Sequence, residues 1–206
     1  MRTKTTKESK REDSISRYMD ALFDNYSKIN VIRVDLSYKQ EVAATKTLEE
    51  ANKDLNRMMN NRRGKPTVFN NQVGYIIAKE YTPKKGVHFH TAFIYDGQKV
   101  LKDINKAIQI GKYWEEDITN NEGLYFSCNQ KKEQYKDLGI GIISHDDTEK
   151  RENLIEHVAS YLGKDDKKQD IAQVKAEGKN ERGLIRGIIP KKKKANIGRP
   201  RNIIDN

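Results

Sequence analysis

The sequence has few of the residues that build covalent cross-links or cysteine-based metal sites. Its 206 residues include one cysteine, Cys128, which excludes an internal disulfide bond and a zinc site made of clustered cysteines. It has no run of about 18 apolar residues, and residues 1–13 lack the apolar stretch that a signal peptide needs. We therefore expect no transmembrane helix and a protein that works in the cytoplasm.

Acidic residues are the minority among the charged side chains. Forty Lys and Arg residues stand against 30 Asp and Glu residues, which gives a formal net charge of +10. Hydrophobic residues make up 35% of the chain and charged residues 34%, enough apolar character for one domain with a modest core. Because Lys and Arg bound to phosphates release counterions, nucleic acid is the polyanion that this charge favours. The expected partner is DNA.

The chain divides into three parts by composition. Residues 1–13 are polar and predicted to be flexible, residues 14–190 carry the patterns of a folded domain, and residues 191–206 form a basic tail predicted to be disordered. Periodicity predicts helices over residues 16–27, 47–62, 99–118 and 148–162, and strands over residues 31–38, 73–81, 87–95, 123–128, 138–144 and 182–189. Interleaved helices and strands around an antiparallel hairpin indicate an α+β fold.

Two local signals sharpen this pattern. Thr47 followed by Glu50 is a capping box, which predicts where the second helix starts. In residues 31–38, Ile32, Val34 and Leu36 alternate with polar residues, which predicts a strand with one buried face.

The hairpin carries the first candidate site. His88 and His90 are two residues apart in a strand, so their side chains share a face of the sheet. If the polar loop is centred near Lys84, Glu80 lies across from His88 on that face. Two imidazoles and a carboxylate suit a divalent cation such as manganese, magnesium or zinc. Paired histidines also occur as ordinary half-buried residues, and the register of Glu80 is what favours a metal site.

A second candidate site lies at the end of the last predicted helix. Tyr161 and Lys164 are three residues apart, a spacing that places both on one helix face. An ammonium group beside a phenol can hold a phosphate and favour the phenolate. A lone helical tyrosine is more often a packing residue. His157 lies one turn earlier and stays open as a catalytic helper, a DNA contact or a surface residue.

The ordered set of motifs resembles a known superfamily. HFH at 88–90 followed by YLGK at 161–164 resembles the second and third motifs of rolling-circle replication initiators, which are His-hydrophobic-His (HUH) endonucleases. The inovirus-type replication initiators of phages and phage satellites are similar, in order, to VIRVDL at 31–36, KE at 79–80, HFHTAFIYDG at 88–97, Trp114 and SYLGK at 160–164. The similarity covers about residues 28–190.

This resemblance implies an antiparallel sheet of about five strands flanked by helices, and a metal-dependent DNA nickase with a single catalytic tyrosine. Tyr161 would attack a DNA phosphate, form a 5′-phosphotyrosyl intermediate and leave a 3′ hydroxyl. Manganese or magnesium would be held by His88, His90 and Glu80, and Lys164 would orient the DNA backbone.

The resemblance leaves the third metal ligand open, and one residue departs from the family pattern. The third metal ligand varies between relatives, so Asp35 stands as a substitute for Glu80. Gly163 occupies the place before the lysine where the family often has a bulkier residue. If Tyr161 is not the nucleophile, Tyr135 and Tyr125 are the alternatives.

The implied substrate is single-stranded or locally melted DNA at an origin of rolling-circle-type replication. Host or phage replication proteins are expected as partners, because the chain has no helicase or primase motif. Three other functions stay open: a nickase that cuts a competing phage genome, a single-tyrosine transposase or relaxase, and a DNA-binding module without catalysis.

The basic tail is a candidate for non-specific phosphate binding that weakens with salt. Its cationic residues are Lys191, Lys192, Lys193, Lys194, Arg199 and Arg201. A solvated tail without a function is the alternative.

Overall fold

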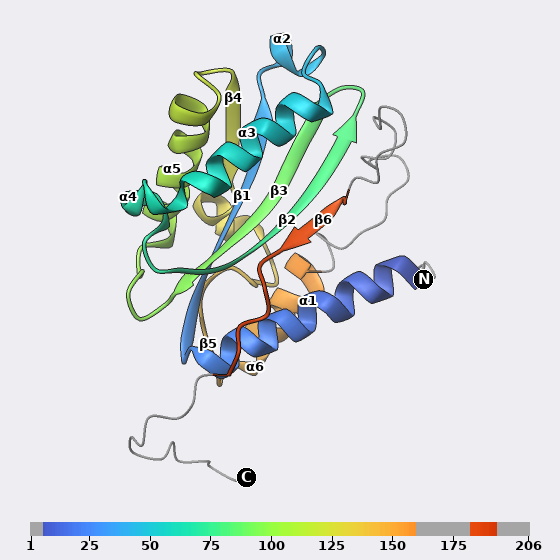
Figure 1. Cartoon of the computed structure of the whole chain (residues 1–206). Coiled ribbons are helices and arrows are strands. Elements are labelled where there is room, and N and C mark those ends of the chain that lie inside the picture. Colours follow the sequence, from blue (N-terminus) through green and yellow to red (C-terminus); the bar gives the residue numbers. More distant parts are fainter. Residues whose placement is uncertain (1–5, 160–181, 193–206) are drawn as a thin grey trace.

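The computed structural model describes residues 6–159 and 182–192. Within these residues, six strands form one antiparallel sheet flanked by helices, which confirms the α+β prediction (Figure 1). The strands are β1 (Lys28–Tyr38), β2 (Gln72–Thr82), β3 (Gly86–Asp96), β4 (Gly123–Ser127), β5 (Gly141–Ser144) and β6 (Leu184–Arg186). The sheet has one strand more than the resemblance implied. Each of the six strands overlaps a segment where periodicity predicted one, although β1 starts three residues before its predicted segment.

The helical elements connect and flank these strands. They are α1 (Thr6–Asn25), α2 (Gln40–Ala43), α3 (Leu48–Asn60), η1 (Asn61–Arg63), α4 (Pro66–Phe69), α5 (Asp103–Lys112), η2 (Tyr113–Ile118), η3 (Asn129–Gln134), α6 (Thr148–Asn153) and η4 (Leu154–Ala159). The segments η2 and η4 are π-helical continuations of α5 and α6. The start of α3 agrees with the sequence, since the Thr47 side chain accepts from the Glu50 amide in a capping box.

The first helix begins earlier than the sequence predicted, at Thr6 and not near residue 16. Residues 6–13 belong to α1 and are not part of a loose segment that runs to residue 13. The side chains of Ile15, Tyr18, Met19 and Leu22 are all buried, and their spacing places them on one face of the helix. The helix therefore packs on the sheet through this stripe, and its polar N-terminal turns continue beyond it.

The order of the sheet is β4-β1-β3-β2-β6, and β5 pairs with the part of β1 that β4 leaves free. Strand β3 is therefore in the middle, with β1 and β2 as its neighbours. The predicted alternation is confirmed, because Ile32, Val34 and Leu36 are buried while Arg33, Asp35 and Ser37 are only partly buried. Toward the start of β1, Ile29 and Val31 on the opposite face are buried as well.

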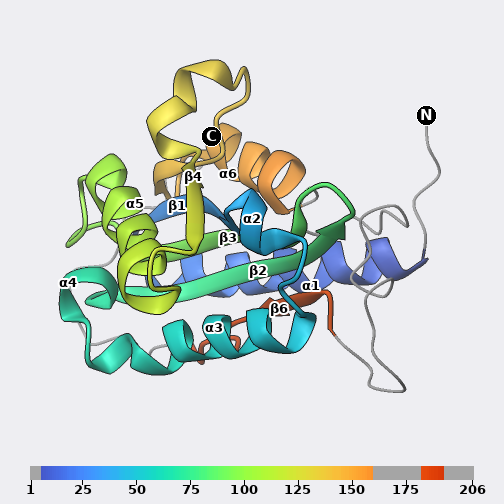
Figure 2. The ribbon, with the colours of Figure 1, turned by 90° about the horizontal axis from the view of Figure 1, so that it is seen from above.

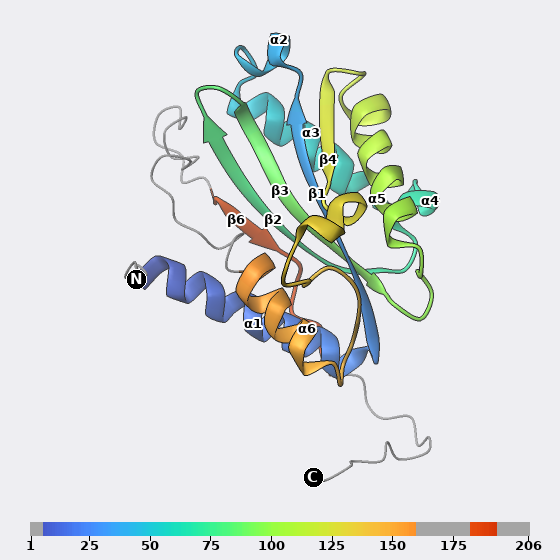
Figure 3. The ribbon, with the colours of Figure 1, turned by 180° about the vertical axis from the view of Figure 1, so that it is seen from behind.

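Helices cover both faces of the sheet, which is why the first half of β1 is buried on both sides. Figure 2 shows α3 on one side of the sheet and α6 on the other. One core contains Phe89, Phe93 and Trp114. The other contains Ala92 and Ile94 of β3, together with buried side chains of α1 and Leu154. Figure 3 shows that α1 and α6 cross this second face away from the hairpin end of β2 and β3.

None of the helices in the described ranges combines the length and the apolar character that crossing a bilayer requires.

Candidate functional site

The hairpin between β2 and β3 has the register that the sequence predicted. Glu80 pairs with His88, and Ala78 pairs with His90. Gly86 opens β3 with a φ of 63°, a left-handed conformation in which a Cβ would overlap the carbonyl oxygen of Ala43. Glycine at this turn therefore lets the two strands close tightly and brings Glu80 and His88 onto one rung.

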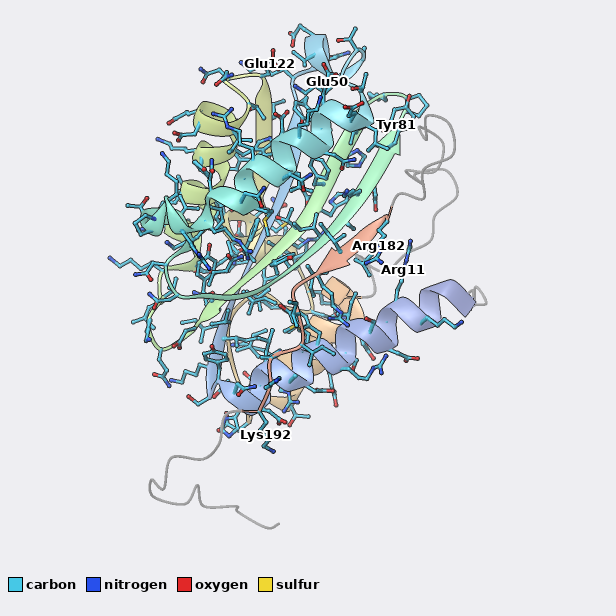
Figure 4. All side chains as sticks on the ribbon, viewed as in Figure 1. Arg11, Glu50, Tyr81, Glu122, Arg182 and Lys192 are labelled. Carbon is cyan, nitrogen blue, oxygen red and sulfur yellow. The ribbon has the colours of Figure 1, made fainter. Side chains whose placement is uncertain are left out.

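Glu80, His88 and His90 converge on one point. A carboxylate oxygen of Glu80 lies 3.2 Å from Nε2 of His90 and 3.5 Å from Nε2 of His88. The three groups each offer a ligand atom, and these atoms all lie within 4.8 Å of one another. Tyr81, the chain neighbour of Glu80, marks this end of the hairpin in Figure 4. The three residues predicted as metal ligands are thus brought together and could hold a metal ion.

The other nitrogen of each imidazole faces an oxygen atom. Nδ1 of His88 lies 3.1 Å from the carbonyl oxygen of Gly86, and Nδ1 of His90 lies 2.8 Å from a carboxylate oxygen of Asp35. Histidines that bind metals direct their second nitrogen to such acceptors, which fixes the tautomer and leaves a lone pair on Nε2. Both Nε2 atoms face the Glu80 carboxylate, so the donor set and its supporting contacts fit a divalent cation.

Asp35, the alternative third metal ligand in the sequence analysis, does not face the same histidine nitrogen as Glu80. It lies on β1 directly across from His90 and faces Nδ1, whereas Glu80 faces Nε2. The geometry favours Glu80 over Asp35 as the third ligand and gives Asp35 the position of an orienting carboxylate. The sequence did not reveal this role, because it depends on which strand lies next to β3.

The pKa values of Glu80 and His90 are shifted in opposite directions. Burial alone would lower the pKa of His90, but the carboxylates of Asp35 and Glu80 outweigh burial and raise this pKa to about 9. Burial alone would raise the pKa of Glu80, but contacts with His88 and His90 outweigh burial and lower this pKa to about 2. Without a metal, a proton on His90 holds the carboxylates together, at the place where a cation would carry the charge.

We expect the metal-free protein to lose stability as the pH rises through the titration of His90. The raised pKa stabilises the folded protein below the ordinary histidine value of 6.5, and this contribution disappears as the pH approaches about 9. The lowered pKa of Glu80 stabilises it above the ordinary glutamate value of 4.5, and this contribution disappears as the pH falls toward about 2. The stabilising contributions of His90 and Glu80 are therefore both complete only between pH 4.5 and pH 6.5.

Thermal melts in the presence of a chelator test this pH dependence. The melting temperature of the wild-type protein is expected to fall between pH 6.5 and pH 9, as the His90 proton is lost. His90→Gln removes the titrating group and should flatten the fall. Melting temperatures that decline in parallel for both proteins would contradict the assigned pKa shift.

A pocket of about 540 Å³ opens beside the two histidines. Its walls include Lys84 and Lys85 from the hairpin loop, and Leu124 and Phe126 from β4. The sequence did not predict these four residues as one site, because the hairpin loop and β4 come together only when β4 takes its place beside β1.

The structure does not place the other predicted site residues beside Glu80, His88 and His90. Tyr161, Lys164 and most of the basic tail lie outside the described residues, as does the side chain of His157. Lys191 and Lys192 are described and exposed, and Lys192 lies 3.8 Å from Asp24 at the end of α1. Figure 4 places Lys192 at the opposite end of the molecule from Tyr81 and the hairpin. The start of the tail is therefore remote from the metal ligands.

Comparison with known proteins assigns most of the chain to one family. No curated protein and no solved structure matches the chain. The replication-initiator family that the motifs resemble is not confirmed by these comparisons. The family model of the YagK/YfjJ C-terminal domain matches residues 2–179, a range that includes the candidate ligands Glu80, His88 and His90. The chain belongs to the YagK/YfjJ C-terminal domain family.

Proposed function

We propose that this chain is a metal-dependent endonuclease that nicks one DNA strand, with Tyr161 as the nucleophile. The observation that carries the proposal is the convergence of Glu80, His88 and His90, with each histidine oriented through Nδ1. Manganese or magnesium is the proposed cation. When bound there, it would supply positive charge to a non-bridging oxygen of the scissile phosphate.

The face of the sheet on which the histidines lie supports the choice of Tyr161. Every second residue of β3 points to the same face, so His88 and His90 share a face with Ala92 and Ile94. Ala92 and Ile94 pack in one core with Leu154. The helix formed by α6 and η4 therefore lies on the histidine side of the sheet. Its described part ends at Ala159, two residues before Tyr161 in the sequence.

The reaction proposed for Tyr161 is a transesterification. Its phenolic oxygen attacks phosphorus, its proton passes to water, and the bond to the 3′ oxygen breaks. The 3′ oxygen takes a proton from water and leaves as a hydroxyl, while the 5′ phosphate stays on the tyrosine. Lys164 is proposed to orient the backbone and to favour the phenolate. The ester keeps the bond reactive, so the 3′ hydroxyl can rejoin the strand.

A free 3′ hydroxyl is also a primer, which links the proposed chemistry to rolling-circle-type replication or to nicking of a competing phage genome. In the first role, host or phage replication proteins would have to unwind and extend the nicked strand. The location of the cut separates the two roles. A replication initiator cuts the origin of the DNA that encodes it, whereas a nickase directed at a competitor cuts the competing phage genome.

The proposal is tested without knowing the recognition sequence by using a random pool of single-stranded oligonucleotides. The protein is incubated with the pool and manganese, and DNA covalently attached to the protein is isolated and sequenced. We expect adducts that carry the 3′ label of the DNA, and free fragments that carry the 5′ label and that a polymerase can extend. A matched reaction with a chelator should give neither. Absence of adducts and of extendable fragments with both manganese and magnesium would contradict the proposal.

A further inference from the structure

The edge strand β4 presents apolar side chains next to the metal ligands. Phe126 pairs with Asp35, which in turn pairs with His90, so the three residues lie on one rung and one face of the sheet. Neighbouring strands are about 4.8 Å apart, so the backbones of Phe126 and His90 are roughly 10 Å apart. Leu124 follows on the same face. The exposed fractions of Leu124 and Phe126 are 42% and 47%.

Packing within the described chain does not account for this exposure. Tyr125, between the two residues, turns to the opposite face and contacts the position of Gly111 on α5. The ring of Tyr125 thus packs toward α5, although Tyr125 is also among the lining residues of the pocket. The side chains of Leu124 and Phe126 stay exposed and line this pocket, which also reaches His88 and His90. An exposed apolar patch beside a polar site is typical of a binding surface.

The charges around the pocket favour an anionic occupant. Lys84 and Lys85 are exposed in the hairpin loop and line the same pocket as Phe126, against one acidic residue among the lining, Asp35. The chain as a whole has a formal net charge of +10. A flat aromatic ring with nearby ammonium groups is the combination that binds single-stranded nucleic acid, because a base stacks on the ring while phosphates contact the lysines. A neutral peptide strand would not use the lysines.

We propose that this pocket holds one unpaired base of single-stranded DNA, stacked on Phe126 and flanked by Leu124, with the adjoining phosphates at Lys84 and Lys85. This inference rests on the proposed nuclease function, since it names the part of the substrate that lies beside the scissile phosphate. A base within a duplex is stacked on its neighbours and is not available to Phe126. The pocket therefore selects single-stranded or melted DNA.

The test measures binding without cleavage. The full chain is titrated in a chelator against a fluorescent single-stranded oligonucleotide of about 16 nucleotides that contains 2-aminopurine, with the matching duplex as comparison. Phe126→Ala is expected to weaken single-strand binding by roughly ten- to a hundredfold and to remove the quenching of 2-aminopurine that stacking causes. Phe126→Trp should restore both signals. Leu101→Ala, at a 62% exposed leucine that does not line the pocket, is the matched control and should bind like wild type.

Salt dependence tests the lysines separately. For single strands the slope of log affinity against log salt changes by about 0.7 for each phosphate that the protein no longer neutralises, so Lys84→Gln with Lys85→Gln should flatten it by about 1.4. An unchanged slope would overturn the placement of phosphates at these lysines.

Two outcomes would overturn the base-binding pocket: unchanged single-strand affinity in Phe126→Ala, or an equal reduction in affinity for the duplex. Because binding is measured without metal, failure of the nuclease proposal has a different signature. A protein that never cuts but binds through Phe126 would overturn the nuclease and support the pocket. If the wild-type protein cuts DNA and the Phe126→Ala variant binds single strands normally, the nuclease proposal is supported and the base-binding pocket is overturned.

Discussion

Replacing Tyr161 by phenylalanine is expected to abolish nicking and covalent adduct formation while DNA binding stays within about threefold of wild type. The substitution removes one oxygen atom, the proposed nucleophile, and leaves the ring. Loss of a nucleophile that forms a covalent intermediate lowers the rate by at least roughly a thousandfold. The measurement is adduct formation on a denaturing gel, with anisotropy as the binding assay.

Tyr125→Phe and Tyr135→Phe are the matched controls for this prediction. Tyr125 lines the pocket beside the histidines, but its ring packs against the position of Gly111 on the opposite face of the sheet, so its hydroxyl is expected to be dispensable. Burial, a hydrogen bond with Cys128 and the negative charges of Cys128 and Asp35 raise the pKa of Tyr135 to about 12. The raised pKa disfavours the phenolate that attack requires. Nicking that persists in Tyr161→Phe and disappears in Tyr135→Phe would move the nucleophile to Tyr135.

Replacing His88 or His90 by alanine is expected to remove activity and to weaken manganese binding by at least about a hundredfold. Each change deletes one of three ligands whose donor atoms lie within 4.8 Å of one another. Isothermal titration calorimetry measures the metal affinity. His145→Ala is the matched control, because this histidine follows β5 and takes no part in the cluster. Manganese affinity that is unchanged by alanine at His88 or His90 would contradict the metal site.

The same titration separates the roles of Glu80 and Asp35. Glu80→Gln should reduce metal affinity as strongly as loss of a histidine, because the carboxylate faces both Nε2 atoms. Asp35→Asn should cost only about 10- to 100-fold, the range for a group that orients a ligand through its second nitrogen. The reverse order would make Asp35 the ligand and Glu80 the orienting group.

The sequence alone determined the features that depend on neighbours along the chain. The alternation of side chains on a strand places His88 and His90 on one face, and the short loop around Lys84 sets the register that brings Glu80 opposite His88. The capping box at Thr47 likewise needs only residues three positions apart. In each case the interacting groups are joined by a few residues, so local geometry decides their contact.

The tertiary structure decided which strands and helices become neighbours. Alternation in β1 predicts a strand, yet only packing of helices on both faces explains why Val31 is buried as fully as Val34. The contact of Asp35 with His90 needs β1 beside β3, and the wall formed by Phe126 needs β4 beside β1. These pairs are separated by 55 and 91 residues in the chain, as their numbers give (90 − 35 and 126 − 35). Contacts at such separations depend on how the whole chain packs, and single-sequence periodicity carries no information about them.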